Sequence, residues 1–213
     1  MKITWLGHSS FLIEDSKGRK ILTDPFDESV GYKTFNGDVD VVTISHHHFD
    51  HDFTKNLDSS KVHILDKVGA FNLCDIPIIG FPSFHDETKG TKRGENTIYV
   101  ITVDGYKICH LGDLGHTLSK DEIISLGNID ILLIPVGGNY TIDAKTAYEL
   151  TKSLKSRIII PMHYKTPALS FPLDGVENFL TFMKNVKKSN DNFINITGDI
   201  SDMTNEVFIL NYK

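Results

Sequence analysis

Many short apolar runs, separated by polar turns at close intervals, limit the folds available to this chain. Short runs rich in Val, Ile, Leu and Phe and bounded by Gly, Asp, Ser or Lys are typical of β-strands. Asp104-Gly105 separates two of them by two residues, which predicts a type I′ hairpin. The expected strands are residues 2–5, 11–14, 20–23, 39–44, 62–65, 76–80, 98–103, 106–111, 131–136, 157–160 and 207–210.

Helix signals are fewer and fall mainly in the second half of the chain. Ser119 to Glu122 reads as a capping box, with Gly127 as the stop. Asp143 is placed to cap a second helix, and Asp174 a third that continues to Met183. Strands with one-sided amphipathic helices predict an α/β (α+β) fold in which helices cover the outer faces of sheets. The pattern itself leaves open a two-sheet sandwich or one mixed sheet.

Length and composition indicate an ordinary globular chain. At 213 residues, with 40% hydrophobic and 23% charged residues, we expect one domain spanning residues 1–213. The net charge of −6 favours neither a nucleic-acid nor a membrane partner. Cys74 and Cys109 form no zinc-type pair, and the N-terminus lacks the apolar run of a signal peptide, so we expect cytoplasmic residence. A homo-oligomer is left open.

The segment from Ser45 to Asp52 carries the strongest functional signal. It contains His46, His47, His48, Asp50 and His51, and it follows the apolar run 39–44. Side chains at alternate positions after a strand can converge, so His46 and His48 are expected to share an ion. Asp50 and His51 would face a second ion. Imidazole and carboxylate suit zinc, manganese or iron, and no thiolate requires zinc. A solvated polar turn is the simpler alternative, but such clusters seldom serve structure alone.

Other candidate ligands also stand just beyond apolar runs. His85, Asp113 and His163 each follow one, and Asp24 and His8 follow shorter ones. If these runs are strands, their ends can gather at one edge of the fold, where ligand sites of α/β proteins often lie. The remaining histidines are assigned elsewhere: His47 to an exposed position or to support of the ligands, His63 to the core, and His110 to packing in a strand or to support of the ligands.

In this order, His46-x-His48-x-Asp50-His51, His85, Asp113 and His163 resemble the metallo-β-lactamase superfamily over essentially the whole chain. The resemblance implies a four-layer αβ/βα sandwich with metals at one edge. Segments 5–10, 93–97, 110–116, 135–138 and 160–165 resemble a branch of small stand-alone hydrolases that includes proteins similar to L-ascorbate-6-phosphate lactonase. No further domain like that of the RNA-processing members fits in this length.

The resemblance also implies a set of roles for these residues. His46, His48 and His85 would hold one metal, Asp50, His51 and His163 the other, and Asp113 would bridge the two divalent ions. Zinc is the first expectation, with manganese or iron as alternatives. Asp50 would also serve catalysis by orienting a hydroxide between the metals. Asp24 matches an early aspartate that supports the site.

The expected activity is metal-dependent hydrolysis of a small, anionic or neutral ester, lactone or phosphoester. Two alternatives stay open: a phosphodiesterase or nuclease acting on nucleotides or RNA ends, and a metal-binding sensor or interaction protein without turnover. Five residues are expected near the substrate, each with a structural alternative. His8 and His116 either touch substrate or support metal ligands, Lys165 and Arg93 meet an anion or solvent, and Asn139 lines the pocket or serves a turn.

Overall fold

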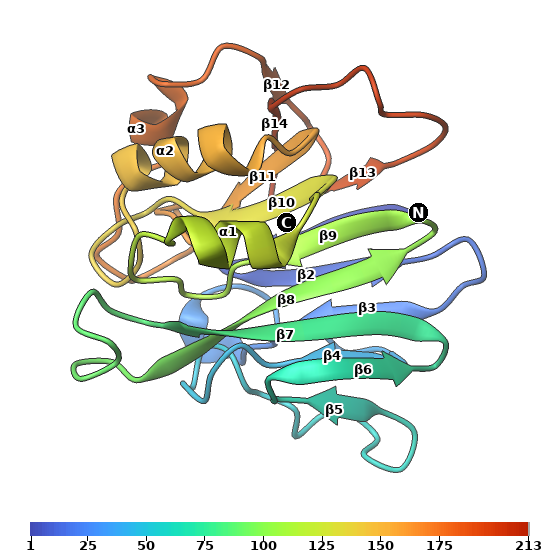
Figure 1. Cartoon of the computed structure of the whole chain (residues 1–213). Helices are drawn as coiled ribbons and strands as arrows, with labels where there is room; N and C mark the ends of the chain where they lie inside the picture. The colour runs from blue at the N-terminus through green and yellow to red at the C-terminus, as the bar shows by residue number, and fades with distance from the viewer. Residues whose placement is uncertain (213) are drawn as a thin grey trace.

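Two β-sheets stacked face to face form the body of the protein. The computed structural model describes residues 1–212 (Figure 1). The six-stranded sheet has the order β13-β1-β2-β3-β4-β5, and the eight-stranded sheet has the order β12-β14-β11-β10-β9-β8-β7-β6. The strands are β1 (Lys2–Gly7), β2 (Ser10–Glu14), β3 (Lys20–Thr23), β4 (Val41–Thr43), β5 (His63–Leu65), β6 (Gly69–Leu73), β7 (Ile76–Phe84), β8 (Glu95–Val103), β9 (Tyr106–His110), β10 (Ile131–Pro135), β11 (Ile158–Met162), β12 (Val186–Lys188), β13 (Phe193–Asn195) and β14 (Glu206–Ile209). The helices are η1 (Glu28–Val30, a 3-10 turn), α1 (Lys120–Leu126), α2 (Ala144–Leu154) and α3 (Glu177–Leu180).

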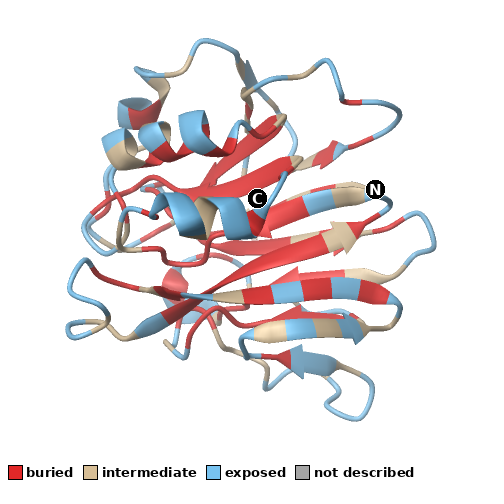
Figure 2. Ribbon diagram, viewed as in Figure 1, coloured by how far each residue is buried: buried red, intermediate tan, exposed pale blue. Residues whose placement is uncertain are grey.

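The middle strands of the smaller sheet are buried on both faces, because they alternate apolar side chains between two clusters. Ile21 of β3 and Val41 of β4 join the large core that also contains the inner residues of the other sheet. Their neighbours Leu22 and Val42 point the other way and pack in a separate cluster under residues 35–62. Figure 2 shows the buried residues concentrated in the strands of both sheets. The expected two-sheet sandwich is therefore confirmed, and the single mixed sheet is excluded.

Helices α1 and α2 cover the outer face of the larger sheet as the crossovers between β9, β10 and β11 (Figure 1). The predicted capping box is present, with Ser119 Oγ accepting from Glu122 N and Glu122 Oε2 accepting from Ser119 N. Asp143 caps α2 by accepting from Thr146 N at 2.8 Å. Over the smaller sheet the described residues form η1 and loops, so the helical layer expected there is reduced to one short turn.

Some local predictions are confirmed and others are wrong. Asp104 and Gly105 have φ values of 50° and 84°, as a type I′ turn requires. The helix expected from Asp174 spans only Glu177–Leu180, because the Asp174 backbone bonds to Gly137 and Lys165 instead of starting a helix. His63, expected in the core, is exposed, since β5 is the outermost strand of its sheet. Strands β6, β12 and β13 were not expected at all.

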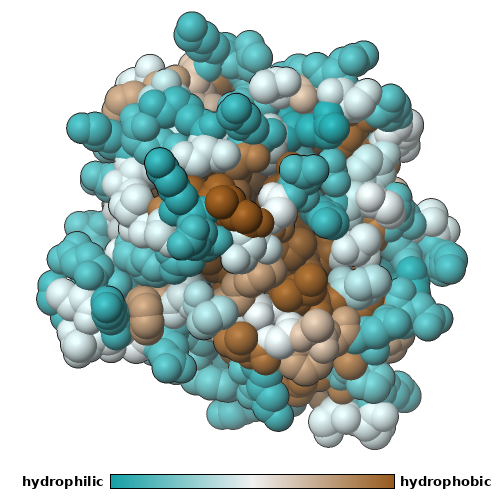
Figure 3. Space-filling view, viewed as in Figure 1, coloured by the Kyte–Doolittle hydropathy of each residue, from teal (hydrophilic) through white to brown (hydrophobic). Residues whose placement is uncertain are grey.

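The surface of the helix-bearing face carries an apolar area next to α1 (Figure 3). Ile124 of α1 is 74% exposed. Within residues 1–212, no helix has both the length and the apolar character needed to cross a membrane.

Candidate metal centre

The strand directions bring the predicted ligands to one end of the sandwich. In the smaller sheet β1, β3 and β4 run parallel to one another, since β1 and β3 both pair antiparallel with β2. In the larger sheet β7, β9, β10 and β11 share one direction for the same reason. The candidate residues follow the carboxyl ends of these seven strands: His8 after β1, Asp24 after β3, residues 46–51 after β4, His85 after β7, Asp113 after β9, Asn139 after β10 and His163 after β11.

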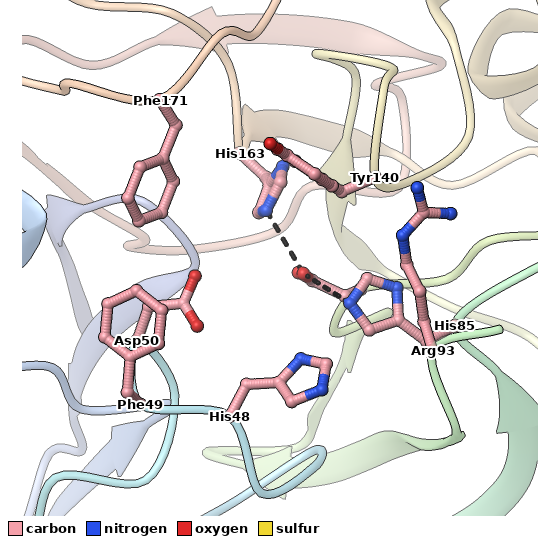
Figure 4. Close-up of a pocket in the computed structure, with 9 residues that line it drawn as sticks. His48, Phe49, Asp50, His85, Arg93, Tyr140, His163 and Phe171 are labelled. Carbon is pink, nitrogen blue, oxygen red and sulfur yellow. Dashed lines mark ion pairs between the residues drawn. The ribbon is translucent and has the colours of Figure 1, made fainter.

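Asp113 is the centre of this arrangement. Its carboxylate is buried, and its Oδ2 lies 3.1 Å from His163 Nε2, 3.3 Å from His85 Nε2 and 3.3 Å from His51 Nε2. His46 Nε2 is 4.0 Å away. Figure 4 shows His163 and His85 reaching the same carboxylate from different directions, with dashed lines marking these two ion pairs. One oxygen is therefore shared by imidazoles from strand ends of both sheets.

The histidines fall into two groups on either side of Asp113, each able to hold an ion. One is His46, His48 and His85, whose ligand atoms all lie within 4.8 Å of one another. The other is His8, His51 and His163, with the same spread. Asp50 stands beside this second group, its Oδ2 3.6 Å from His51 Nε2 and 3.1 Å from His8 Nε2. His8 was expected to contact substrate or to support metal ligands. The structure places it within one of the two groups that could hold an ion.

The chemistry of the donor set fits divalent metal ions. Nε2 of His46 and Nε2 of His51 are buried and form no hydrogen bond within residues 1–212, although they lie 4.0 Å and 3.3 Å from Asp113 Oδ2. Burying unpaired polar atoms is unfavourable, and several of them directed at one point are well explained by metal ligation. The donors are imidazole nitrogens and carboxylate oxygens, with Cys109 buried in β9 and Cys74 at the end of β6. A third combination, Asp24 with His46 and His51, meets the same 4.8 Å limit.

Asp24 fixes the orientation of two of these histidines. It is fully buried, and its Oδ2 lies 2.9 Å from His51 Nδ1. The same carboxylate accepts from Ser45 N at 2.8 Å and from Ser45 Oγ at 2.6 Å, and Ser45 Oγ in turn lies 2.9 Å from His46 Nδ1. These contacts leave Nε2 of both rings directed at Asp113. The sequence pointed to Asp24 but gave no sign of Ser45 beyond its place before His46.

Burial and neighbouring charges set the protonation of the site. Burial lowers the pKa of His46 to about 3, helped by the charge of His51, so its ring is neutral and can donate a lone pair at neutral pH. Burial would also lower the pKa of His51, but the Asp113 and Asp24 carboxylates outweigh it and raise that pKa. Burial would raise the pKa of Asp113, yet His163 and His51 hold it well below its usual range.

Three buried residues of the centre adopt left-handed backbone conformations. His8, Asp24 and His163 have φ values of 51°, 40° and 50°, a region that side chains other than glycine seldom occupy. Such strain persists only where the surrounding structure enforces it, and it clusters at functional sites. The His8 carbonyl accepts from Trp5 Nε1 at 3.0 Å and from His163 N at 3.1 Å, which holds two of these turns together.

A cavity of about 380 Å³ opens directly onto the centre. Asp50, His48, His85, Asp113 and His163 form its floor, and the remaining lining residues are Phe49, Arg93, Tyr140 and Phe171. Phe49, 61% exposed, lies 6.0 Å from Phe171 between ring centroids, and Figure 4 shows this pair across the cavity from Arg93 and Tyr140. Of the aromatic residues in these walls, Tyr140 directly follows Asn139, which was expected to line the pocket. Phe49 and Phe171 carried no such signal in the sequence.

The other residues expected near substrate are placed as follows. Arg93 lines the cavity, whereas Asn139 supports it through its carbonyl, which accepts from Arg93 Nη2 at 3.2 Å. Lys165 is not among the lining residues, and its Nζ donates to the carbonyls of Leu169 and Phe171. His116 is also outside the cavity and accepts from Phe84 N.

His47 and His110 lie where the sequence placed them. His47 is exposed, with its ring nitrogens near Asp52 and Asp66. His110 is buried in β9, with its Nε2 2.8 Å from the Ser9 carbonyl. Two further polar residues hold Asp113 from behind and were missed in the sequence: Asn96 Oδ1 accepts from Asp113 N, and Ser9 Oγ donates to Asp113 Oδ1.

Comparison with known proteins agrees with this geometry. A family model described as the β-lactamase superfamily domain matches residues 2–163. The chain belongs to the metallo-β-lactamase superfamily. One relative, a UPF0173 metal-dependent hydrolase of Thermoplasma volcanium, is 32% identical to this chain over 191 residues, which cover 78% of this chain and 84% of the relative. Another, from Pyrococcus furiosus, is 30% identical over 195 residues, covering 78% and 85%.

One solved structure resembles this chain over its full length. The crystal structure of a Thermotoga maritima protein, assigned to the Zn-dependent hydrolases of the superfamily, aligns with a TM-score of 0.83 and 36% identity over 100% of this chain and 99% of that one. The predicted fold is confirmed, and the chain is a metal-dependent hydrolase of this superfamily.

Proposed function

We propose that this chain hydrolyses a small ester, lactone or phosphoester at a centre that holds two divalent metal ions. The observation that supports this most directly is the position of Asp113 Oδ2, within 3.3 Å of Nε2 of His51, His85 and His163. A single carboxylate oxygen between two histidine groups is suited to bridging two ions. Bound ions of this kind supply an acidified water and polarise the scissile carbonyl or phosphoryl oxygen.

The proposed ligands are those expected from the sequence. His46, His48 and His85 hold one ion, and Asp50, His51 and His163 hold the other. With nitrogen and oxygen donors, zinc is the first candidate, and manganese and iron are the alternatives.

Asp50 is the residue proposed to act in catalysis. Burial would raise its pKa, but the hydrogen bond from His8 and the charge of His51 outweigh this and hold the pKa below the usual range. The carboxylate is therefore ionised at neutral pH, and it lines the cavity. An ionised oxygen there accepts a hydrogen bond from the attacking water and orients it toward the substrate.

Separate reconstitution with zinc, manganese and iron tests the proposal. Each form is analysed for metal content and assayed with p-nitrophenyl carboxylesters, a lactone panel, the phosphomonoester p-nitrophenyl phosphate and the diester bis-p-nitrophenyl phosphate. We expect two ions per chain and turnover of a carboxylester, a lactone or the phosphomonoester in at least one form. Preference for bis-p-nitrophenyl phosphate would instead assign a phosphodiesterase. Fully metallated protein without turnover across the panel would contradict hydrolysis of these substrates.

A further inference from the structure

The cavity contains a single arginine whose charge is not matched by a carboxylate. Among the lining residues in the described chain, Arg93 is the one Lys or Arg. Within residues 1–212, arginine ion pairs join Arg19 to Asp15 and Arg157 to Asp130, and none includes Arg93. Its guanidinium carbon lies 5.4 Å from the Tyr140 ring centroid, and Nη2 donates to the Asn139 carbonyl. A half-buried, unpaired guanidinium beside a hydrolytic centre is suited to an oxyanion.

The loop that carries Arg93 is built around the buried carboxylate of Asp86. Asp86 Oδ1 accepts from Thr88 N at 2.8 Å, Thr88 Oγ1 at 2.6 Å and Gly90 N at 3.1 Å. Its Oδ2 accepts from Lys92 N at 3.0 Å and from Arg93 N at 2.8 Å. Asp86 is 2% exposed, so these bonds form inside the loop and not with solvent. One side chain thus fixes the backbone from which Arg93 extends.

The loop that carries Arg93 also begins and ends next to His85, one of the predicted metal ligands. Asp86 follows His85 directly, and His85 N donates to Gly94 O at 3.1 Å, which closes the loop at its base. Gly115 packs so closely on this base that an added Cβ would lie 2.3 Å from the His85 carbonyl carbon. Hydrogen bonds and close packing therefore hold this segment at both ends, so the fold sets where the Arg93 backbone lies relative to His85.

We propose that Arg93 selects substrates that carry an anionic carboxylate or phosphate together with an apolar group, and that Asp86 is the positioning residue that holds Arg93 for this task. The apolar group would lie against Phe49 and Phe171, which face Arg93 across the cavity (Figure 4). This inference rests on the proposed hydrolysis for its kinetic test, but the binding of anions can be measured without turnover.

The kinetic test compares a matched pair of esters, neutral 4-nitrophenyl butyrate and anionic mono-4-nitrophenyl succinate. We expect Arg93→Gln to lower the ratio of kcat/KM for the anionic over the neutral ester on the order of tenfold, mainly through KM, because a charge-assisted hydrogen bond is lost. Arg93→Lys should recover part of the ratio. Lys92→Gln is the matched control: it removes a neighbouring charge that is exposed and paired with Glu87, and the ratio should not change.

Asp86→Asn should lower the same ratio, and the double variant with Arg93→Gln should be no worse than Arg93→Gln alone. This lack of additivity distinguishes positioning of Arg93 from general damage to the loop. Metal content should equal that of the wild type in every variant. Thr88→Ala, which removes one bond to Asp86, provides a milder perturbation if Asp86→Asn folds poorly. Equal losses for both esters, or additive losses in the double variant, would overturn the proposal.

A binding measurement separates this inference from the proposed function. Phenylphosphonate and phenylacetate are titrated into zinc-loaded protein by calorimetry, with phenylacetamide as the neutral probe. Weaker binding of the two anions, with unchanged binding of phenylacetamide, in Arg93→Gln supports the assignment even if no ester is hydrolysed. The comparison of the two anions reports whether phosphate or carboxylate is preferred. Unchanged anion binding in that variant would reject Arg93 as the selecting residue, whatever the activity.

Discussion

Replacing Asp24 with asparagine should weaken metal binding through the tautomer of His51. In the native site Asp24 Oδ1 accepts from Ser45 N, while Oδ2 accepts from Ser45 Oγ and from His51 Nδ1 at 2.9 Å. An asparagine whose oxygen stays with Ser45 N presents its NH₂ group to the other two partners. The Ser45 hydroxyl can turn and accept, but His51 Nδ1–H would face another donor. The ring then favours its proton on Nε2, the nitrogen directed at Asp113.

The size of the effect follows from this geometry. One charge-assisted hydrogen bond is lost, worth about 1.5–3 kcal/mol. The metal must also bind a ring whose ligating nitrogen is protonated. Loss of a residue that orients a metal-ligating histidine typically lowers affinity roughly 10- to 100-fold, which corresponds to about 1.4–2.8 kcal/mol. We expect a loss within this range for the ion held by His51.

Zinc affinity is measured by titrating metal-free protein against a chromophoric chelator, with elemental analysis after dialysis as a second readout. Asp199→Asn is the matched control, because Asp199 is an exposed carboxylate that accepts from Ser201 N and Oγ at 2.8 Å in a loop outside the cavity. It should bind zinc as the wild type does. If folded Asp24→Asn binds zinc with wild-type affinity, Asp24 does not set the tautomer of His51 and the reasoning fails.

Three further predictions concern the bridge, a helix cap and acid stability. Asp113→Ala should lose both metal content and activity, since one oxygen serves both histidine groups; full occupancy by elemental analysis would refute its bridging role. Asp143→Ala should lower the free energy of unfolding by about 1 kcal/mol, and the melting temperature by roughly 2–4 °C, with unchanged metal content. Burial would raise the pKa of Asp15, but its bonds to Arg19 hold that pKa below the unfolded value. The stabilisation that Asp15 contributes is therefore present above pH about 4 and is lost as the pH falls through the lowered folded pKa. Asp15→Asn should therefore show a shallower loss of stability with acid than the wild type in denaturant titrations.

Local features of the fold could be predicted because their causes lie within a few residues of one another. The Asp104-Gly105 turn and the capping box at Ser119 are examples, since the residue types alone favour their geometry. The helix expected from Asp174 failed because its backbone groups bond to Gly137 and Lys165, partners that the sequence does not bring near. The prediction that His63 is buried was wrong because β5 lies at a sheet edge, and that position depends on the whole strand order.

More residues of the candidate metal centre than of the cavity around it could be predicted, because these residues follow the ends of strands that run in one direction. Each expected ligand stands after an apolar run, and parallel strands end at the same edge, so His85, Asp113 and His163 come together through strand direction alone. Lys165 shows the limit of this rule. It follows β11 closely, yet its Nζ donates to the Leu169 and Phe171 carbonyls, which become available because the loop after it folds back.

Buried aspartates link the local features of the fold to the metal centre. Each accepts several hydrogen bonds at the end of a strand and thereby fixes which side chains face the cavity. Asp86 collects donors from the next seven residues, a local arrangement of which the Asp-x-Thr sequence is a visible part. Asp24 collects them from Ser45 and His51, far along the chain, and no local signal marks these partners. The first kind of aspartate sets the loop that carries Arg93, and the second sets the His51 ring that faces Asp113. Which histidines and aspartates gather at this end of the fold can therefore be predicted from the sequence, whereas the orientation of each side chain depends on contacts that form only when the two strand ends meet.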